Sequence, residues 1–329
     1  MTQSKAVLEA CVGLVLALCA ATPASANLVI NLTYDSSFAT QFGSNTGAAQ
    51  SAIGYAAQQF EDLYSDPIHV NITIAGVAGT GTLGESDTFL DSFSYTSIRN
   101  ALIVDARSSD DLTAVGPGGS VVPIDPVTGT HSWWTSTAQA KALGLMPDGL
   151  SMDGTITFGA GFSYTFDPAN RTAGGKIDFI GVVEHEMSEI MGRIGLSGAT
   201  VSQSMNAYAL LDNFAYTGPG AKGLGFVAND FFSINNGNSL LKQFNSTAGA
   251  DSRDWAGGSP DSFNAFVTVG AEEDITPVDV REMDVLGYDL AVPEPGTVLL
   301  LGGGLLVLLK RRGRKTPVFA LRPHSEPRA

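Results

Sequence analysis

Two apolar segments at the ends of the chain delimit the part that can fold into a globular body. Near the N-terminus, Lys5 precedes an apolar run over residues 12–18, and Ala24-Ser25-Ala26 follows it. This order of a positive charge, a short apolar run and small residues is typical of a secretory signal peptide. A retained membrane anchor is the alternative, but the run is short for a spanning helix. We therefore expect signal peptidase to remove residues 1–26 before Asn27.

The composition bounds what the remaining chain can do. Both cysteines, Cys11 and Cys19, lie in the expected signal peptide, so the mature protein would have no disulfide and no thiolate nucleophile. The apolar share of 44% is ordinary for a packed core, which opposes wholesale disorder. The net charge is −15 although the C-terminus is basic. Such an acidic body repels phosphate backbones, so we expect no nucleic acid partner.

The C-terminal segment combines three features in a fixed order. Pro293-Glu294-Pro295 precedes an apolar run over residues 297–309, and Lys310-Arg311-Arg312-Gly313-Arg314-Lys315 follows it. The run is near the lower length limit of a transmembrane segment, and basic residues after it would hold that end in the cytoplasm. Residues 292–315 resemble the PEP-CTERM sorting signal of Gram-negative bacteria, followed by a basic tail at 316–329.

This resemblance implies where the protein goes. It implies export to the cell envelope, the surface or the medium, with transient membrane anchoring by the C-terminal segment. It also implies processing by an exosortase-type sorting enzyme.

Between the two ends, residues 27–291 are expected to form an α+β domain. Residues 27–194 alternate between strand and helix patterns, whereas residues 195–291 are loop-rich with short apolar pieces and form a smaller irregular half. Residues 154–158 and 162–166 are predicted to pair across Gly159-Ala160-Gly161. The expected elements are strands at residues 27–34, 69–75, 154–158 and 162–166, and helices at residues 48–64, 96–105, 136–145, 178–194 and 277–286.

The residues with chemical potential lie on the predicted helix at 178–194. His185 and Glu189 are four residues apart and therefore share one helical face. Imidazole and carboxylate groups are both zinc ligands. Glu186 lies one step around the helix, where it can reach a water molecule on the same ion and act as general base.

A solvated acidic face is the alternative interpretation of this helix. Glu184, Glu186 and Glu189 would then point to solvent, and His185 would be incidental. Two features oppose it: apolar neighbours leave little of the helix for solvent, and three acids near one histidine repel each other unless a cation offsets them.

The segment from Asp178 to Arg193 resembles the active-site helix of zincin-like, more narrowly metzincin-like, metalloproteases. Glu189 stands where the second histidine of H-E-x-x-H would be, and Gly195 stands where a third histidine would be. The form H-E-x-S-E-x-M-G-R is similar to that of an exported bacterial family of metalloproteases with a PEP-CTERM signal. The resemblance implies a zincin-like fold, with a twisted mixed sheet and a central active-site helix, and a Zn²⁺ cofactor.

A zinc site needs a third protein ligand. Asp212 is the favoured candidate, because the chain can turn back after the helix and apolar residues flank this carboxylate. A turn or cap residue is the alternative interpretation of Asp212, and His131 is another possible donor. Oxygen ligands also gather at residues 249–255 and at Asp261, where a structural Ca²⁺ or merely a solvated turn is expected.

The sequence thus predicts an exported zinc-dependent metalloendopeptidase acting on protein or peptide substrates. A substrate is expected to pair with the strand edge near residues 162–166. The alternative is a non-catalytic surface or biofilm matrix protein that keeps a zincin-like fold.

Overall fold

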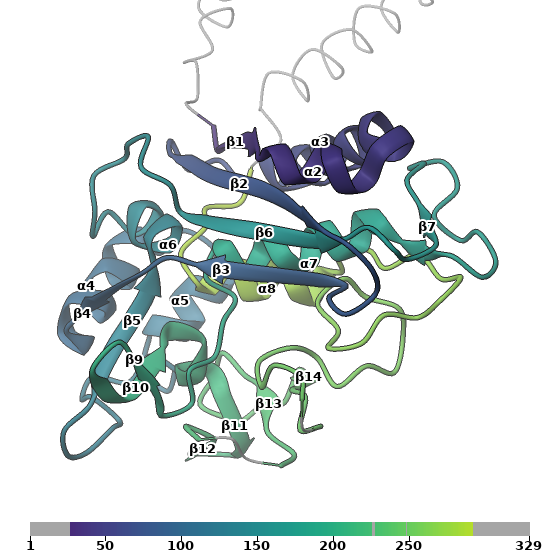
Figure 1. Ribbon diagram of the computed structural model, residues 1–329. Helices are drawn as coiled ribbons and strands as arrows, with labels where there is room; N and C mark the ends of the chain where they lie inside the picture. Colours follow the sequence, from purple (N-terminus) through teal and green to yellow (C-terminus); the bar gives the residue numbers. More distant parts are fainter. Residues whose placement is uncertain (1–26, 226–227, 248, 292–329) are drawn as a thin grey trace, which may run out of the picture. The chain divides into compact units, whose positions relative to one another are not determined.

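A four-stranded mixed sheet forms the N-terminal half of the structure (Figure 1). Its strand order is β1-β2-β6-β3. β1 (Val29–Tyr34), β2 (His69–Val77) and β6 (Gly154–Gly159) are parallel, whereas β3 (Gly84–Thr88) runs antiparallel to β6 at the edge. The computed structural model describes residues 27–225, 228–247 and 249–291. The expected signal peptide, the apolar segment at 297–309 and the basic tail at 316–329 lie outside these residues.

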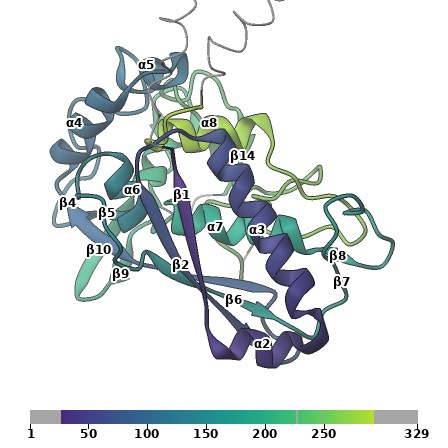
Figure 2. The ribbon, with the colours of Figure 1, turned by 90° about the horizontal axis from the view of Figure 1, so that it is seen from above.

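Helices α3 (Thr46–Leu63) and α7 (Phe179–Ile190) pack against each other along one face of this sheet (Figure 2). Burial alternates along β2: Ile72 and Ile74 are fully buried, whereas Thr73 between them is only half-buried. This alternation is the pattern of a sheet that buries one face.

The central helix α7 is buried over almost its whole length. It begins after Asp178, whose side chain accepts a hydrogen bond from the amide of Ile180, a standard N-cap. It ends at Ile190, four residues before the predicted end. Gly192, at φ 108°, ends the helix, because the chain there adopts a backbone conformation that side chains other than glycine rarely reach.

Three further sheets, five further α-helices and two 3₁₀ helices complete the described part of the chain. The second sheet has the order β4-β5-β10-β9, the third β12-β11-β13-β14, and β7 pairs with β8. The strands are β4 (Leu90–Phe93), β5 (Ser132–Ser136), β7 (Tyr164–Thr165), β8 (Ile177–Asp178), β9 (Ala199–Val201), β10 (Ser204–Ala209), β11 (Ala215–Gly218), β12 (Ala221–Lys222), β13 (Phe231–Phe232) and β14 (Lys242–Gln243). The α-helices are α2 (Ser36–Phe42), α4 (Tyr95–Asp105), α5 (Ser109–Val115), α6 (Thr137–Ala142) and α8 (Pro277–Val285), and the 3₁₀ helices are η1 (Gly43–Asn45) and η2 (Leu210–Phe214).

The mixed α+β class predicted from the sequence is confirmed, but the predicted pairing of residues 154–158 with 162–166 is wrong. β6 pairs with β2 and β3, and β7 pairs with β8 instead. The reason lies in the glycine-rich segment between β6 and β7. The amides of Ala160 and Gly161 donate to the carbonyls of Val77 and Gly79, so the chain continues alongside the turn after β2 rather than folding back on β6.

No α-helix in the described ranges is long and apolar enough to cross a membrane.

Candidate metal centre

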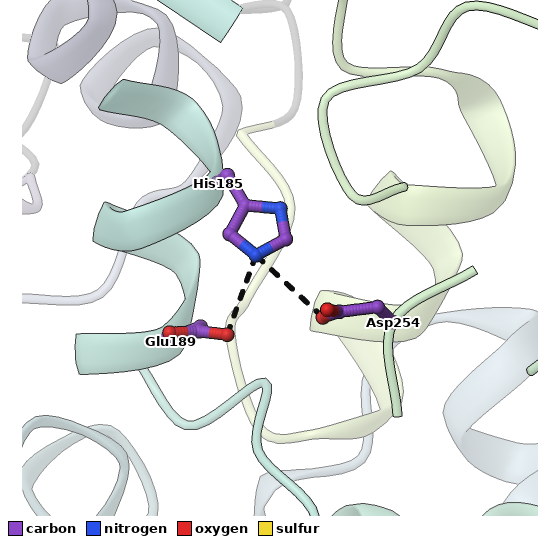
Figure 3. Close-up of side chains that lie close together, drawn as sticks. All are labelled: His185, Glu189 and Asp254. Atoms are coloured by element: carbon purple, nitrogen blue, oxygen red, sulfur yellow. Dashed lines mark ion pairs between the residues drawn. The ribbon is translucent and has the colours of Figure 1, made fainter. Parts of the chain in front are cut away.

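Three potential metal ligands converge where α7 faces the loop that follows β14 (Figure 3). His185 and Glu189 come from α7, and Asp254 comes from the loop. Nε2 of His185 lies 3.4 Å from Oε1 of Glu189 and 3.6 Å from Oδ1 of Asp254. One ligand atom from each residue lies within 4.8 Å of those of the other two. Among the described residues, no other group of three His, Cys, Asp or Glu side chains brings its ligand atoms this close together.

The size of this group fits a zinc ion. Zinc binds nitrogen and oxygen ligands at about 2.0–2.2 Å in tetrahedral geometry, which separates neighbouring ligand atoms by about 3.3 Å. The separations from His185 to Glu189 and Asp254 are close to this value. One imidazole and two carboxylates also form a donor set of the kind that zinc accepts. The residues present therefore fit the metal that the sequence predicted.

Each of the three side chains is held by a second contact. Nδ1 of His185 donates to the carbonyl of Ser262 at 2.9 Å; since a carbonyl only accepts, Nδ1 carries the proton and Nε2 faces the two acids. Ser86 Oγ donates to Oε2 of Glu189 at 2.5 Å, and Arg193 Nη1 donates to Oδ1 of Asp254 at 2.5 Å. Outer contacts of this kind orient the ligands in metal sites.

The two acids favour positive charge between them. Burial and the charge of Arg193 act to lower the pKa of His185, but the charges of Asp254 and Glu189 raise it to about 9. Burial acts to raise the pKa of Glu189, but the hydrogen bond and charge of His185, with Arg193, hold it well below its usual range. The site therefore stabilises a cation, which is the electrostatic requirement of a metal centre.

Glu186 lies beside these ligands and under the edge strand of the main sheet. Its side chain is buried, and a Cβ atom on Gly84 of β3 would lie only 2.3 Å from its Oε1. Burial, with the nearby charge of Glu189, raises the pKa of Glu186. A carboxylate with a raised pKa is suited to accept a proton and return it near neutral pH.

A cleft of about 650 Å³ opens over the site. Gly84 and Ser86 of β3 line one part of it, and Ala265, Phe266 and Val267 line another. Phe266 is 55% exposed. The three candidate ligands and Glu186 also line this cleft, so a molecule bound there would reach them.

Asp212 has a different role from the one predicted from the sequence. It is fully buried in η2, and its Oδ2 accepts hydrogen bonds from the amides of Leu196, Ser197 and Ala209. Its Oδ1 lies 2.8 Å from Nε of Arg253. The carboxylate is thus occupied by backbone amides and an arginine, and the second acid that lies beside His185, with Glu189, is Asp254. The alternative interpretation, a cap residue, describes what Asp212 does.

The other predicted donors lie apart from the centre. His131 contacts Asp125 at 2.9 Å. At residues 249–255 and Asp261, where a structural Ca²⁺ or a solvated turn was expected, Asp261 pairs with Lys242, whereas Asp254 faces His185. The only feature of the sequence that indicated Asp254 was its place in an acid-rich loop. Sequence spacing relates residues within one helix or strand, so it could not pair this loop residue with Glu189, 65 positions earlier on a helix.

Comparison with known proteins identifies one segment of the chain. Residues 291–315 match the PEP-CTERM protein-sorting motif. The chain carries a PEP-CTERM sorting signal. This confirms the prediction from the sequence and marks an exported protein of the Gram-negative cell envelope that an exosortase-type enzyme recognises. No curated protein and no solved structure gives a significant match to the chain.

Proposed function

We propose that this PEP-CTERM protein is an exported zinc-dependent metalloendopeptidase. His185, Glu189 and Asp254 would hold the ion, and Glu186 would act as general base. The observation that carries the proposal is the convergence of three donors from two distant segments, each held by an outer contact, on the floor of a cleft.

The chemistry follows from the position of Glu186. A zinc ion supplies Lewis acidity that makes a water molecule a nucleophile at neutral pH. Glu186 takes the proton from the attacking water and later delivers it to the amine that leaves. Glu186 is buried between β3 and α7 and also lines the cleft, so its carboxyl would meet the reacting groups there.

An extended substrate would bind along the free edge of strand β3. One of its edges pairs with β6, and the strand lines the cleft with Gly84, Glu85 and Ser86. A peptide can add to such an edge through backbone hydrogen bonds. This location replaces the predicted strand edge near residues 162–166, since β7 belongs to a separate two-stranded sheet.

A non-catalytic surface or matrix protein is the second candidate, and one contact favours it. Arg193 already lies within ion-pair distance of both Asp254 and Glu189, so the two acids have a positive partner from the chain itself. In that case the cluster would only join α7 to the loop of Asp254.

Metal content and peptidase activity separate the two candidates. We expect the purified exported protein to contain about one zinc per chain, and Glu189→Ala to lose it. Glu186→Gln is expected to keep the zinc while cleavage of casein falls by about 10²–10⁴-fold. A folded protein that takes up no zinc, or a zinc-loaded protein that cleaves no peptide bond, would support the matrix protein instead.

A further inference from the structure

We propose that Arg193 is a positioning residue that holds Glu189 and Asp254 in the geometry needed to bind the metal. This inference rests on the proposed metal site. The guanidinium of Arg193 is fully buried. Its Nη1 lies 2.5 Å from Oδ1 of Asp254, and its Nη2 lies 3.5 Å from Oε1 of Glu189. One rigid, planar group thus contacts both acidic ligands.

The same guanidinium also reaches the parts of the chain that orient His185. Nη2 of Arg193 lies 3.4 Å from the carbonyl of His185, and Nε donates to Oγ of Ser188 at 2.7 Å. Its central carbon lies 4.6 Å from the ring centroid of Phe263, next to Ser262, which accepts the Nδ1 proton of His185. Arg193 therefore contacts three segments: helix α7, the loop of Asp254, and the segment of Ser262 and Phe263. These segments carry or orient the three proposed ligands.

The end of α7 explains how Arg193 reaches this position. The amide of Gly192 donates to the carbonyl of Glu189, and the amide of Arg193 donates to the carbonyl of Ser188. These two bonds form a Schellman motif, which turns the chain back across the helix end. The motif needs the positive φ of Gly192, and a continued helix would place residue 193 elsewhere. The turn at Gly192 therefore places Arg193 where it can contact the two acids.

The charges explain why such a residue is needed. Two carboxylates brought together to share an ion repel each other, and the repulsion is strong at a buried site. Each carboxylate oxygen has two lone pairs. Oδ1 of Asp254 accepts from Arg193 and still faces Nε2 of His185, so the contact with arginine leaves a lone pair for the metal. An arginine offers several donors in a fixed plane, which lysine does not.

Cobalt binding tests the role of Arg193 without relying on activity. Co²⁺ replaces zinc and gives visible absorption bands that depend on ligand geometry. We expect Arg193→Gln to lower the Co²⁺ affinity by about 10–100-fold and to alter the bands, because outer contacts of this kind contribute that much to metal affinity. Arg193→Lys is expected to restore part of the affinity but not the spectrum. Thermal melts of both variants establish which fraction is folded.

Arg171→Lys is the matched control. Arg171 is as deeply buried and pairs with Asp178 at 2.8 Å, but it lies at the opposite end of α7. This variant is expected to keep the wild-type spectrum and an affinity within about twofold, below the effect expected for outer contacts of a metal ligand.

Several outcomes would overturn the inference. If Arg193→Gln binds Co²⁺ as the wild type does, Arg193 does not position the ligands. If it binds more tightly, Arg193 is a substitute cation that competes with the metal. If the wild type itself binds no Co²⁺ or Zn²⁺, the proposed function fails as well. Should neither variant fold, the Nε–H resonance of Arg193 in the wild type decides: it is expected to stay protected from exchange when zinc binds, and its loss would contradict the proposal.

Discussion

The hydroxyl of Ser86 donates a hydrogen bond of 2.5 Å to Oε2 of Glu189, while Oε1 of the same carboxylate faces His185 at 3.4 Å. Ser86 belongs to edge strand β3 and Glu189 to helix α7. The sheet edge therefore fixes the rotation of the Glu189 carboxylate, a proposed metal ligand, on the helix. This contact links the proposed substrate-binding strand to the proposed metal site.

Removal of this hydroxyl is expected to weaken metal binding. In Ser86→Ala the carboxylate of Glu189 can rotate, so zinc affinity should fall by about tenfold, at the lower end of such outer-contact effects. Competition with a chromophoric chelator measures the affinity. Ser92→Ala, at an exposed position on β4, is the control. Equal affinities in the two variants would show that Ser86 does not orient Glu189.

Gly84 is expected to control the position of Glu186, the proposed general base. A Cβ atom here would lie 2.3 Å from Oε1 and 2.9 Å from Cδ of Glu186. Because these atoms are at the end of a flexible side chain, Gly84→Ala should displace the Glu186 carboxyl rather than unfold the strand. We expect kcat to fall at least about tenfold, as for a misplaced proton-transfer group, while the zinc content stays near that of the wild type.

Gly81 provides the control for this substitution. It also lines the cleft, but a Cβ atom at Gly81 has nothing within 4 Å. Gly81→Ala should therefore cleave peptides at nearly the wild-type rate. If both alanine variants lose activity equally, the effect comes from the backbone near the cleft and not from Glu186.

The sequence was informative where one helix or one strand carries the whole pattern. The spacing of His185 and Glu189 predicted a shared face, and α7 places their side chains 3.4 Å apart. The alternation of residues 69–75 likewise predicted β2. Both patterns are local, because the period of the backbone alone decides which side chains share a face.

The sequence was less informative where contacts join distant segments. β3 was not predicted, since Gly84-Glu85-Ser86-Asp87-Thr88 has no apolar alternation; it forms a strand because it pairs with β6. Asp212 and Asp254 are equally plausible ligands by residue type. Only tertiary structure shows that Arg253 binds the former while the latter faces His185.

The two aspartates give a direct test of the ligand set. Asp254→Asn is expected to reduce zinc content to near zero, because an anionic ligand is replaced by a neutral amide. Asp212→Asn is expected to retain zinc in its folded fraction but to lose about 3 kcal/mol of stability, since it breaks a buried ion pair with Arg253. Zinc analysis and urea unfolding measure the two quantities. The reverse pattern, with zinc lost only in Asp212→Asn, would restore Asp212 as the ligand.

A group of acids far along the chain from these ligands should make the fold less stable as pH rises. Burial, with the charges of Asp289 and Asp105, raises the pKa of Asp66 to about 8. Burial and neighbouring acids also raise the pKa of Asp105 and of Asp284 to about 7. Arg107 lies 2.7 Å from Asp289 and offsets only part of this charge.

The sign of the effect follows from proton binding. An unfolded aspartate loses its proton near pH 4, whereas these three keep theirs until about pH 7–8 in the folded chain. The folded state therefore binds more protons between these values, and the free energy of unfolding falls as pH rises through that window. We expect Tm at pH 8.5 to lie about 5 °C below Tm at pH 6, from a loss of about 2 kcal/mol.

Asp66→Asn isolates this contribution from that of other titrating groups. The amide oxygen of asparagine can still accept the hydrogen bond that the amide of Asp289 donates to Asp66 at 2.9 Å. The substitution removes one charge from the group while it keeps this contact, so Tm at pH 8.5 should rise relative to the wild type and change little at pH 5. Asp62→Asn, at an exposed position on α3, controls for the loss of a surface charge. If the two variants shift Tm equally at pH 8.5, burial of Asp66 is not the cause of the pH dependence, because only net charge would then matter.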